Sequence, residues 1–428
     1  AGASDAWWTL APASLLFALA HWGSARFYER RAAGDALWSA AVPLAVGLLS
    51  LLLALSGSLA LARLPSSLRI PQNDAHPSWS GTFAVEQSVF KGSALIFGTG
   101  PNTFTRDWSQ FKPLSVNETD FWSADFESGV GVIPTALITT GILGALSWLL
   151  LLLALAWRGF RFCTRKRLTP ARALPAALLG GSILLAAFHI FYTPGIALSL
   201  IFFLLLGAFI AAEDDDAPPL RIRLSFDSPF GIARVAVLLA LALALAWAGV
   251  WAARAAVSDL LVAKSSAEYQ SGGTLAGSLS LIRAALAAYP DNDAAHRAAV
   301  QLGLLQLQEL MGSGGAPDAQ ALQTALSQTI SEGLQAVSIN SGDYQNWLAL
   351  ASLYQSLASA GVSGAYDNAL SAYQKAAAEG PTNPLPLIGL AQVAAANNDA
   401  TSSITYLTQA IRIKPDLAAA YYLRSQEE

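Results

Sequence analysis

Charge, cysteine and methionine are all scarce in this chain of 428 residues. Charged residues make up 13% of it, whereas an average soluble protein has about 25%. The one cysteine, Cys163, excludes a disulfide within the chain. The net charge is −4, and outside one short loop no basic block is interleaved with aromatic residues, which argues against a nucleic-acid partner. The first residue is Ala1 and the single methionine is Met311, which indicates a processed chain or the C-terminal part of a longer protein.

What the chain has instead is long apolar runs. A helix that crosses the hydrocarbon core of a membrane needs about 20 apolar residues. Six runs approach or exceed this length, and tryptophan or tyrosine lies near many of their ends, as is typical of membrane interfaces. The runs are residues 6–22, 36–61, 132–157, 174–192, 196–212 and 235–253. We therefore predict an all-α fold that begins, over residues 1–257, with a polytopic transmembrane helix bundle of about six spans.

Lysine and arginine residues indicate the orientation of this bundle. They gather in three connections, residues 23–35, 158–173 and 213–234, which lie on one side of the membrane if each run crosses it once. The positive-inside rule places this side in the cytoplasm. The loop 62–131 and all of the chain after residue 253 are then predicted to be extracytoplasmic.

The C-terminal part has the composition of a soluble helical domain with an internal repeat. Its period of 34 residues is that of tetratricopeptide repeats. The matched positions are Ala369, Tyr373, Ala376 and Pro381, followed by Ser403, Leu407, Ala410 and Pro415. Residues 258–308 and 318–339 resemble earlier, degenerate helical pairs. We predict a TPR-like α-solenoid over residues 258–428, which would recruit a protein partner or acceptor outside the membrane.

The loop 62–131 carries the polar and aromatic side chains that a binding site would need. Arg106 and Lys112 are suited to a phosphate or pyrophosphate group, and are equally typical of solvated surface charges. Trp108 and Trp122 could stack on sugar rings or anchor the loop at the membrane interface.

Two local structures are predicted in the same loop. Gly98 and Gly100 bracket a tight turn, and we also expect this turn to lie at the substrate site. Residues 82–90 are predicted to form a short helix with Val85 and Val89 on one face. His189, near the end of its span, is expected to be a hydrogen-bonded structural histidine. No histidine has a second ligand at metal spacing, so we expect no metal and no cofactor.

The sequence order from Trp79 to Gly144 resembles the O-antigen ligase and O-antigen polymerase superfamily, in particular bacterial members with C-terminal tetratricopeptide repeats. Its most specific elements are "FGTGPNTF", which contains Gly98 and Gly100, and "TTGILG", which ends at Gly144. The family usually has an arginine where this chain has Ser80 and a histidine where it has Val130.

The resemblance implies a glycosyltransferase of the bacterial inner (cytoplasmic) membrane that acts in cell-envelope polysaccharide biosynthesis. It would transfer a glycan from a polyprenyl-pyrophosphate carrier, held in the membrane lipid, to an acceptor on the outer face. In this interpretation Arg106 and Lys112 stabilise the departing pyrophosphate, and Glu127 or His76 removes a proton from the acceptor hydroxyl. The alternative is a non-catalytic membrane-anchored scaffold whose repeats bind peptides.

Overall fold

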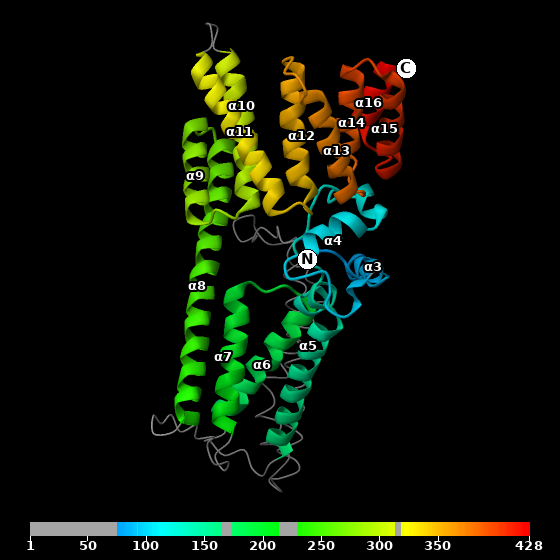
Figure 1. Cartoon of the computed structure of the whole chain (residues 1–428). Coiled ribbons are helices and arrows are strands. Elements are labelled where there is room, and N and C mark those ends of the chain that lie inside the picture. Colours follow the sequence, from blue (N-terminus) through cyan, green and yellow to red (C-terminus); the bar gives the residue numbers. More distant parts are fainter. Residues whose placement is uncertain (1–74, 92, 165–172, 214–228, 313–317) are drawn as a thin grey trace, which may run out of the picture. The chain divides into compact units, whose positions relative to one another are not determined.

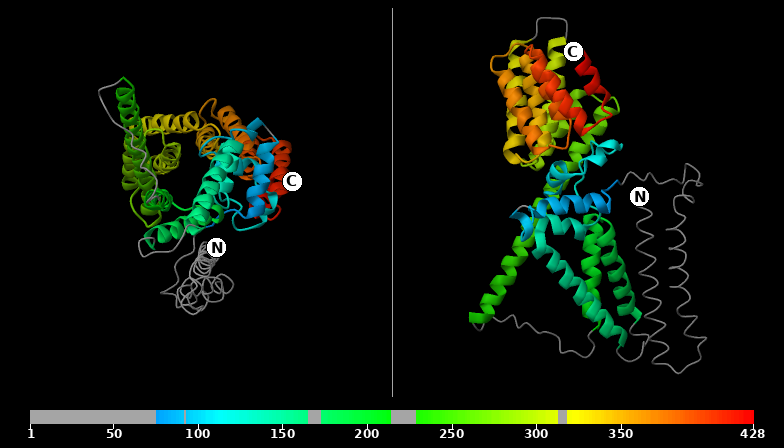
Figure 2. Two further views of the ribbon diagram at one scale, coloured as in Figure 1. Left: turned by 90° about the horizontal axis from the view of Figure 1, so that it is seen from below. Right: turned by 90° about the vertical axis from the view of Figure 1, so that its right-hand side faces the viewer.

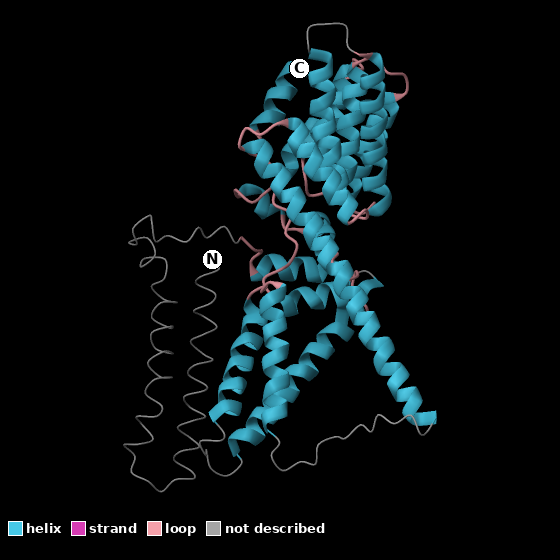
Figure 3. Cartoon of the chain, turned by 90° about the vertical axis from the view of Figure 1, so that its left-hand side faces the viewer, coloured by secondary structure: helices cyan, strands magenta, loops and turns pink. Residues whose placement is uncertain are grey.

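The computed structural model describes residues 75–91, 93–164, 173–213, 229–312 and 318–428 (Figure 1). In these ranges the protein is all-α, with fourteen α-helices, short 3-10 turns and no strand, and loops join the helices (Figure 3). The first two predicted spans, residues 6–22 and 36–61, lie outside the described residues.

Contacts within the chain divide it into two compact units. Unit 1 comprises Ala1–Pro113 and Asp125–Pro219, and unit 2 comprises Leu114–Ala124 and Leu220–Glu428. A short piece of the predicted loop therefore belongs to the unit that contains the repeats. The domain boundary expected at residues 257–258 falls inside one uninterrupted helix of unit 2.

Unit 1 combines long apolar helices with a small folded loop. Its helices are α3 (Trp79–Phe90), α4 (Phe104–Phe111), α5 (Val132–Thr164), α6 (Ala173–Phe191) and α7 (Ile196–Glu213). Helices α5 and α6 are long and apolar enough to cross a membrane, and α7 is a shorter apolar helix. The predicted short helix is confirmed as α3, which buries Val85 and Val89. Ser78 caps this helix by accepting a hydrogen bond from the Gly81 amide.

His189 has the structural role that the sequence indicates. Its ring is 1% exposed on α6. Nδ1 lies 2.7 Å from the carbonyl oxygen of Leu185, and Nε2 lies 3.1 Å from Ser199 Oγ on α7. Both ring nitrogens are therefore satisfied inside unit 1.

Unit 2 is built from antiparallel helix pairs followed by a final helix (Figure 2). The pairs are α8–α9, α10–α11, α12–α13 and α14–α15, and α16 closes the series. Their bounds are α8 (Pro229–Gln270), α9 (Leu275–Ala288), α10 (Asp293–Gly312), α11 (Ala319–Ile339), α12 (Tyr344–Ser359), α13 (Ala365–Glu379), α14 (Leu385–Ala396), α15 (Ala400–Ile413) and α16 (Ala418–Glu427). Helix α8 is long and apolar enough to cross a membrane, and its C-terminal part pairs with α9.

An Asn or Asp side chain starts the first helix in three of these pairs. The side-chain oxygen of Asn292 accepts from the Ala295 amide, that of Asp343 from Gln345, and that of Asn383 from Leu385. Each bond satisfies one of the backbone donors that a helix leaves free at its N-terminus. Each of these residues lies three positions after the residue that caps the C-terminus of the preceding second helix, so a short turn joins one pair to the next.

The predicted repeat is confirmed in the packing of α13 and α15. Helix α13 buries Ala369, Tyr373 and Ala376, and α15 buries their counterparts Ser403, Leu407 and Ala410. The earlier repeat is longer because α12 has 16 residues and α14 has 12. Its loop is also longer, over residues 360–364 instead of 397–399.

The contact between α13 and α14 depends on a glycine. The Tyr373 ring is 3% exposed and lies where a Cβ on Gly389 would be. The ring has little freedom to move, because its hydroxyl donates to Gln355 Oε1 on α12. We expect Gly389→Ala to destabilise the repeats by about 1–3 kcal/mol through overpacking, despite alanine's higher helix propensity.

Thermal unfolding followed by circular dichroism measures this effect. Gly249→Ala is the matched control, because Gly249 lies inside α8 with no neighbouring atom within 4 Å of an added Cβ. An equal effect of the two substitutions would show that the Tyr373 contact is not tight.

Candidate functional site

The glycine turn of the loop packs directly on a break in helix α5. Gly98 and Gly141 both have positive φ, 69° and 65°, and Gly141 interrupts the helical backbone of α5. A Cβ on Gly98 would overlap the backbone of Thr139, and one on Gly141 would overlap that of Ile96. Two backbones approach so closely here that neither position has room for a side chain.

The amides of this turn are already used within unit 1. The N–H of Gly98 donates to Ala94 O, that of Thr99 to Ile138 O, and that of Gly100 to Thr139 O. The last two bonds satisfy carbonyls that the break in α5 would otherwise leave free. The predicted turn is confirmed. Its N–H groups do not form a cradle for a phosphate, so Gly98 and Gly100 shape the loop.

Helix α4 follows the turn and contributes one exposed and one buried candidate side chain. Arg106 is exposed, whereas Trp108 is 1% exposed. The Trp108 ring stacks with Phe104 at 6.2 Å and meets Phe126 edge-on at 5.2 Å between ring centroids. Trp108 is thus a core residue of the folded loop and offers no surface to a sugar or to the membrane.

Asp107 is a buried carboxyl that the sequence did not single out. Its Oδ2 accepts a hydrogen bond of 2.5 Å from Thr99 Oγ1, and Thr103 Oγ1 lies 3.5 Å away. Burial raises the pKa of Asp107 to about 6, although these hydroxyls and the Arg106 charge act in the opposite direction. Thr99, Thr103 and Asp107 are spaced four residues apart across the glycine turn and the start of α4. This spacing is the sequence signal that could have predicted their hydrogen bonds.

Lys112 is buried in the folded loop, where a phosphate ligand does not reach it. Its side chain is 3% exposed. Burial lowers its pKa, and the nearby Asp125 carboxylate opposes this shift. A phosphate could reach the ammonium group only after the residues around it moved.

The remaining predicted residues each have their own surroundings. Glu127 is exposed, and His76 is half-buried with Nδ1 3.1 Å from Pro77 O and its ring edge-on to Tyr192. Trp122 belongs to unit 2, where the Lys414 ammonium lies 5.2 Å from its ring centroid. No group of three His, Cys, Asp or Glu residues that could hold a metal occurs in the part of the chain that the structure describes.

Ser80 and Val130, the two positions that depart from the resembled family, both make hydrogen bonds within the loop. Ser80 is exposed, and its hydroxyl lies 2.9 Å from that of Ser78. Val130 is 3% exposed, and its N–H donates to Thr82 Oγ1. Neither residue supplies a base or a cation.

Unit 2 offers a polar surface across the first helices of neighbouring pairs. Gln355 Nε2 on α12 donates to Gln392 Oε1 on α14 at 3.2 Å. Gln355 also accepts from the Tyr373 hydroxyl, and Ser352 lies 3.4 Å from that hydroxyl. Gln392 is exposed. This row of amides and hydroxyls is the candidate peptide-binding surface of the array.

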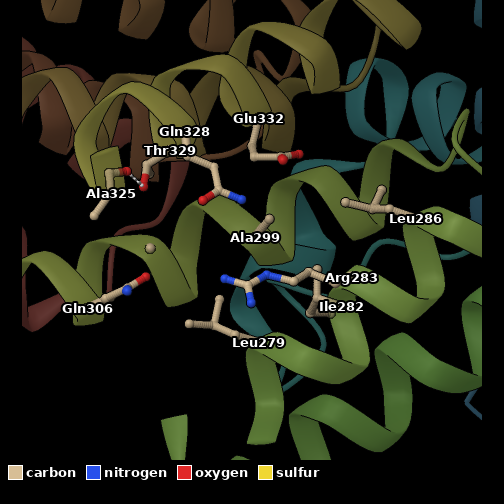
Figure 4. A pocket seen from close by; sticks show the side chains of 11 residues that line it. Leu279, Ile282, Arg283, Leu286, Ala299, Gln306, Ala325, Gln328, Thr329 and Glu332 are labelled. Carbon is tan, nitrogen blue, oxygen red and sulfur yellow. Dashed lines mark hydrogen bonds between the residues drawn. The ribbon is translucent and has the colours of Figure 1, made fainter. Parts of the chain in front are cut away.

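A hollow lies between helices α9, α10 and α11 (Figure 4). Apolar side chains such as Ile282 form part of its wall, and Arg283, Gln328 and Glu332 are among its polar lining residues. Glu332 is not free, since its Oε2 lies 2.5 Å from Nδ1 of His296. Desolvation lowers the pKa of His296, but the Glu332 carboxylate and the Pro290 carbonyl outweigh it and leave the pKa raised.

Comparisons with known proteins agree with the repeat architecture. Residues 363–427 match the tetratricopeptide repeat family model, so the C-terminal segment carries such a repeat. No curated protein matches the chain.

Three solved structures are similar to part of the chain. TTC0263, a thermophilic TPR protein in Thermus thermophilus, is 15% identical over 40% of this chain and 80% of its own, with a TM-score of 0.34. The MamA protein is 16% identical over 40% and 80%, with a TM-score of 0.30. YrrB, a TPR protein with an unusual peptide-binding site, is 15% identical over 39% and 90%, with a TM-score of 0.22.

The carboxyl of Asp107 makes the stability of the folded loop depend on pH. Its folded-state pKa of about 6 lies above the ordinary 3.8, so the fold favours the protonated acid. The resulting stabilisation is fully present below pH 4 and is lost as the pH rises through about 6. A shift of roughly two pKa units corresponds to at most about 3 kcal/mol.

Asp107→Asn imitates the protonated acid and should remove this loss. We expect its melting temperature, relative to the unmodified protein, to rise by several degrees between pH 4 and pH 7.5. A difference that stays constant over this range would show that Asp107 does not titrate there.

Proposed function

We propose that this protein is a membrane-anchored scaffold that binds protein partners through its tetratricopeptide array. The apolar helices α5, α6 and α8 support the anchor, because each has the length and composition of a membrane span. The basic connections support an extracytoplasmic position for the repeats. The observation that carries the proposal is the polar row that joins Gln355 on α12 to Gln392 on α14, because α14 lies in the segment 363–427 that matches the tetratricopeptide model.

The chemistry of this row suits an extended peptide. Glutamine amides both donate and accept hydrogen bonds, so they can pair with the N–H and C=O groups of a peptide backbone. The Tyr373 hydroxyl holds the Gln355 side chain in place, so this side chain loses less conformational entropy when a peptide binds. Few charges lie in this row, and we therefore expect contacts to the peptide backbone to dominate over charge pairing.

Site-specific photocrosslinking in cells tests the proposal. A photoreactive side chain at Gln392 should capture a defined protein partner, because this residue is exposed on the first-helix face. The same group at Lys375, which is exposed on α13, is the matched control and should not capture it. The captured protein, once purified, should bind the unmodified chain and bind Gln392→Arg at least about tenfold more weakly. Equal capture at both positions would contradict binding at the polar row.

A second candidate function is transfer of a glycan from a polyprenyl-pyrophosphate carrier, as in the family that the loop resembles. The observation that favours it is the neighbouring pair Arg106 and Asp107 in the segment that carries the resemblance. Arg106 is exposed and can meet a pyrophosphate. Asp107 has a pKa of about 6, which suits a general base near neutral pH, and an acceptor hydroxyl could reach this buried carboxyl only after the residues around it moved.

Loss of the Arg106 charge tests this second function. We expect Arg106→Ala to reduce glycan transfer in a cell-based complementation assay by roughly 10²–10³-fold, the usual effect of removing one transition-state donor. Lys91→Ala, at an exposed lysine that caps α3, is the control and should retain activity. Normal transfer by a membrane-inserted Arg106→Ala protein would remove Arg106 from the site.

A further inference from the structure

A short segment of the predicted outer loop is bound to the end of the repeat array. We call this segment, Leu114–Ala124, the clip, and it belongs to unit 2 although its sequence neighbours belong to unit 1. Its 3-10 turn (Leu114–Glu118) places Asn117 fully inside the unit, with 0% exposure. Asn117 Nδ2 donates to Thr382 O at 2.9 Å and to Ile413 O at 3.1 Å.

Lys414 holds the clip from the other side. Its ammonium group donates to the backbone carbonyl of Asn117 at 2.7 Å and pairs with Asp416 at 2.8 Å. The same ammonium lies 5.2 Å from the centroid of the Trp122 ring. Lys414 is 6% exposed. Two carbonyls of the array thus accept from the amide of the clip. The one cation of the array contacts a carbonyl and an aromatic face of the clip.

The turn that binds the clip differs from two earlier turns of the array. Residues His296, Trp347 and Leu387 each stand four positions after the residue that starts a first helix, namely Asn292, Asp343 and Asn383. His296 Nε2 binds Pro290 O at 2.9 Å, and Trp347 Nε1 donates to Ser341 O at 2.8 Å. In the first two cases a ring nitrogen therefore binds a carbonyl of the preceding turn.

The third turn has no such internal donor at this position. Leu387 cannot donate a hydrogen bond, and in this turn it is Asn117 of the clip that donates to a carbonyl, that of Thr382. A polar donor from outside the helix pairs thus binds this turn, at the carbonyl one residue after the position that corresponds to Pro290 and Ser341.

We propose that the turn 380–384 and the C-terminal end of α15 form a peptide-docking site, and that the clip is its built-in ligand. The site takes a segment that forms a 3-10 turn, with a carboxamide side chain in the turn and an aromatic residue five positions later. This proposal deepens the scaffold function, but it concerns a different surface from the polar row of Gln355 and Gln392.

The contacts of the clip indicate that it can leave the site. Asn117 Oδ1 is buried and makes no hydrogen bond with any described residue, which costs free energy in the docked state. The residues on either side of Asn117, such as Ser115 and Thr119, are exposed. The unsatisfied Asn117 oxygen lowers the stability of the docked state, and we expect the clip to open while the helix pairs stay folded.

Binding of the clip peptide in trans tests the proposal in the full chain. In one variant, residues 114–124 are replaced by a Gly-Ser linker of equal length, which empties the site. A fluorescent peptide with the sequence of residues 113–125 should bind this variant. It should not bind the unmodified chain, where the clip occupies the site at a high effective concentration.

Matched changes identify the contacts that matter. In the peptide, Asn117→Ala should weaken binding at least about tenfold, since two hydrogen bonds are lost, whereas Ser115→Ala should have no effect. In the linker variant, Lys414→Met should abolish binding and Lys375→Met should not. Circular dichroism shows whether the helix pairs remain folded in each variant.

Two results would overturn the proposal. One is no peptide binding to a folded linker variant, and the other is equal binding by the Asn117→Ala peptide. Neither result bears on crosslinking at Gln392, so failure of the docking site and failure of the scaffold function are distinguishable.

Discussion

The packing of each helix pair against the next is the constraint on which the rest of unit 2 depends. A single pair cannot bury its apolar face, so the pairs are stable only as a stacked series. The contact of the Tyr373 ring with Gly389 shows how close this stacking is. The same ring fixes Gln355 through its hydroxyl, so the packing of the core also orders the surface that we propose for peptide binding.

The polar loop between the apolar runs serves the fold more than the sequence suggests. Its glycine turn supplies amides to a broken helix, Trp108 fills a small core, and Lys112 is buried near Asp125. Another part of it, the clip, is bound by the repeats through Asn117 and Lys414. Of the cations predicted to bind phosphate, only Arg106 is exposed, and this is why the scaffold is our first proposal and glycan transfer the second.

The features that sequence predicts well here are those with a local or periodic cause. Apolar length predicts the helices α5, α6 and α8, and the 34-residue period predicts α13 and α15 with their buried alanines. Val85 and Val89 on α3 and the turn at Gly98 follow from the same kind of short-range pattern. The two spans predicted before residue 75, residues 6–22 and 36–61, lie outside the described residues.

The features that sequence missed all depend on contacts between distant residues. The burial of Lys112 and Trp108 is set by how the loop closes, and Asn117 and Lys414 are almost 300 positions apart, as their hydrogen bond at a separation of 297 residues shows. The high pKa of Asp107 likewise follows from burial, which residue type alone does not reveal. Sequence alone therefore does not show which charged or aromatic residues of a loop are buried in its packing.

Hydrogen–deuterium exchange of the clip amides in the full chain tests the central claim most directly, namely that residues 114–124 fold as part of the repeat array. The Thr119 and Trp122 amides donate to the backbone within the clip, so their protection reports its order. We predict that these amides are protected in the unmodified chain and lose protection in Lys414→Met, while those of α12 and α13 remain protected. Exchange of the clip at the rate of an unstructured peptide in the unmodified chain would contradict the account.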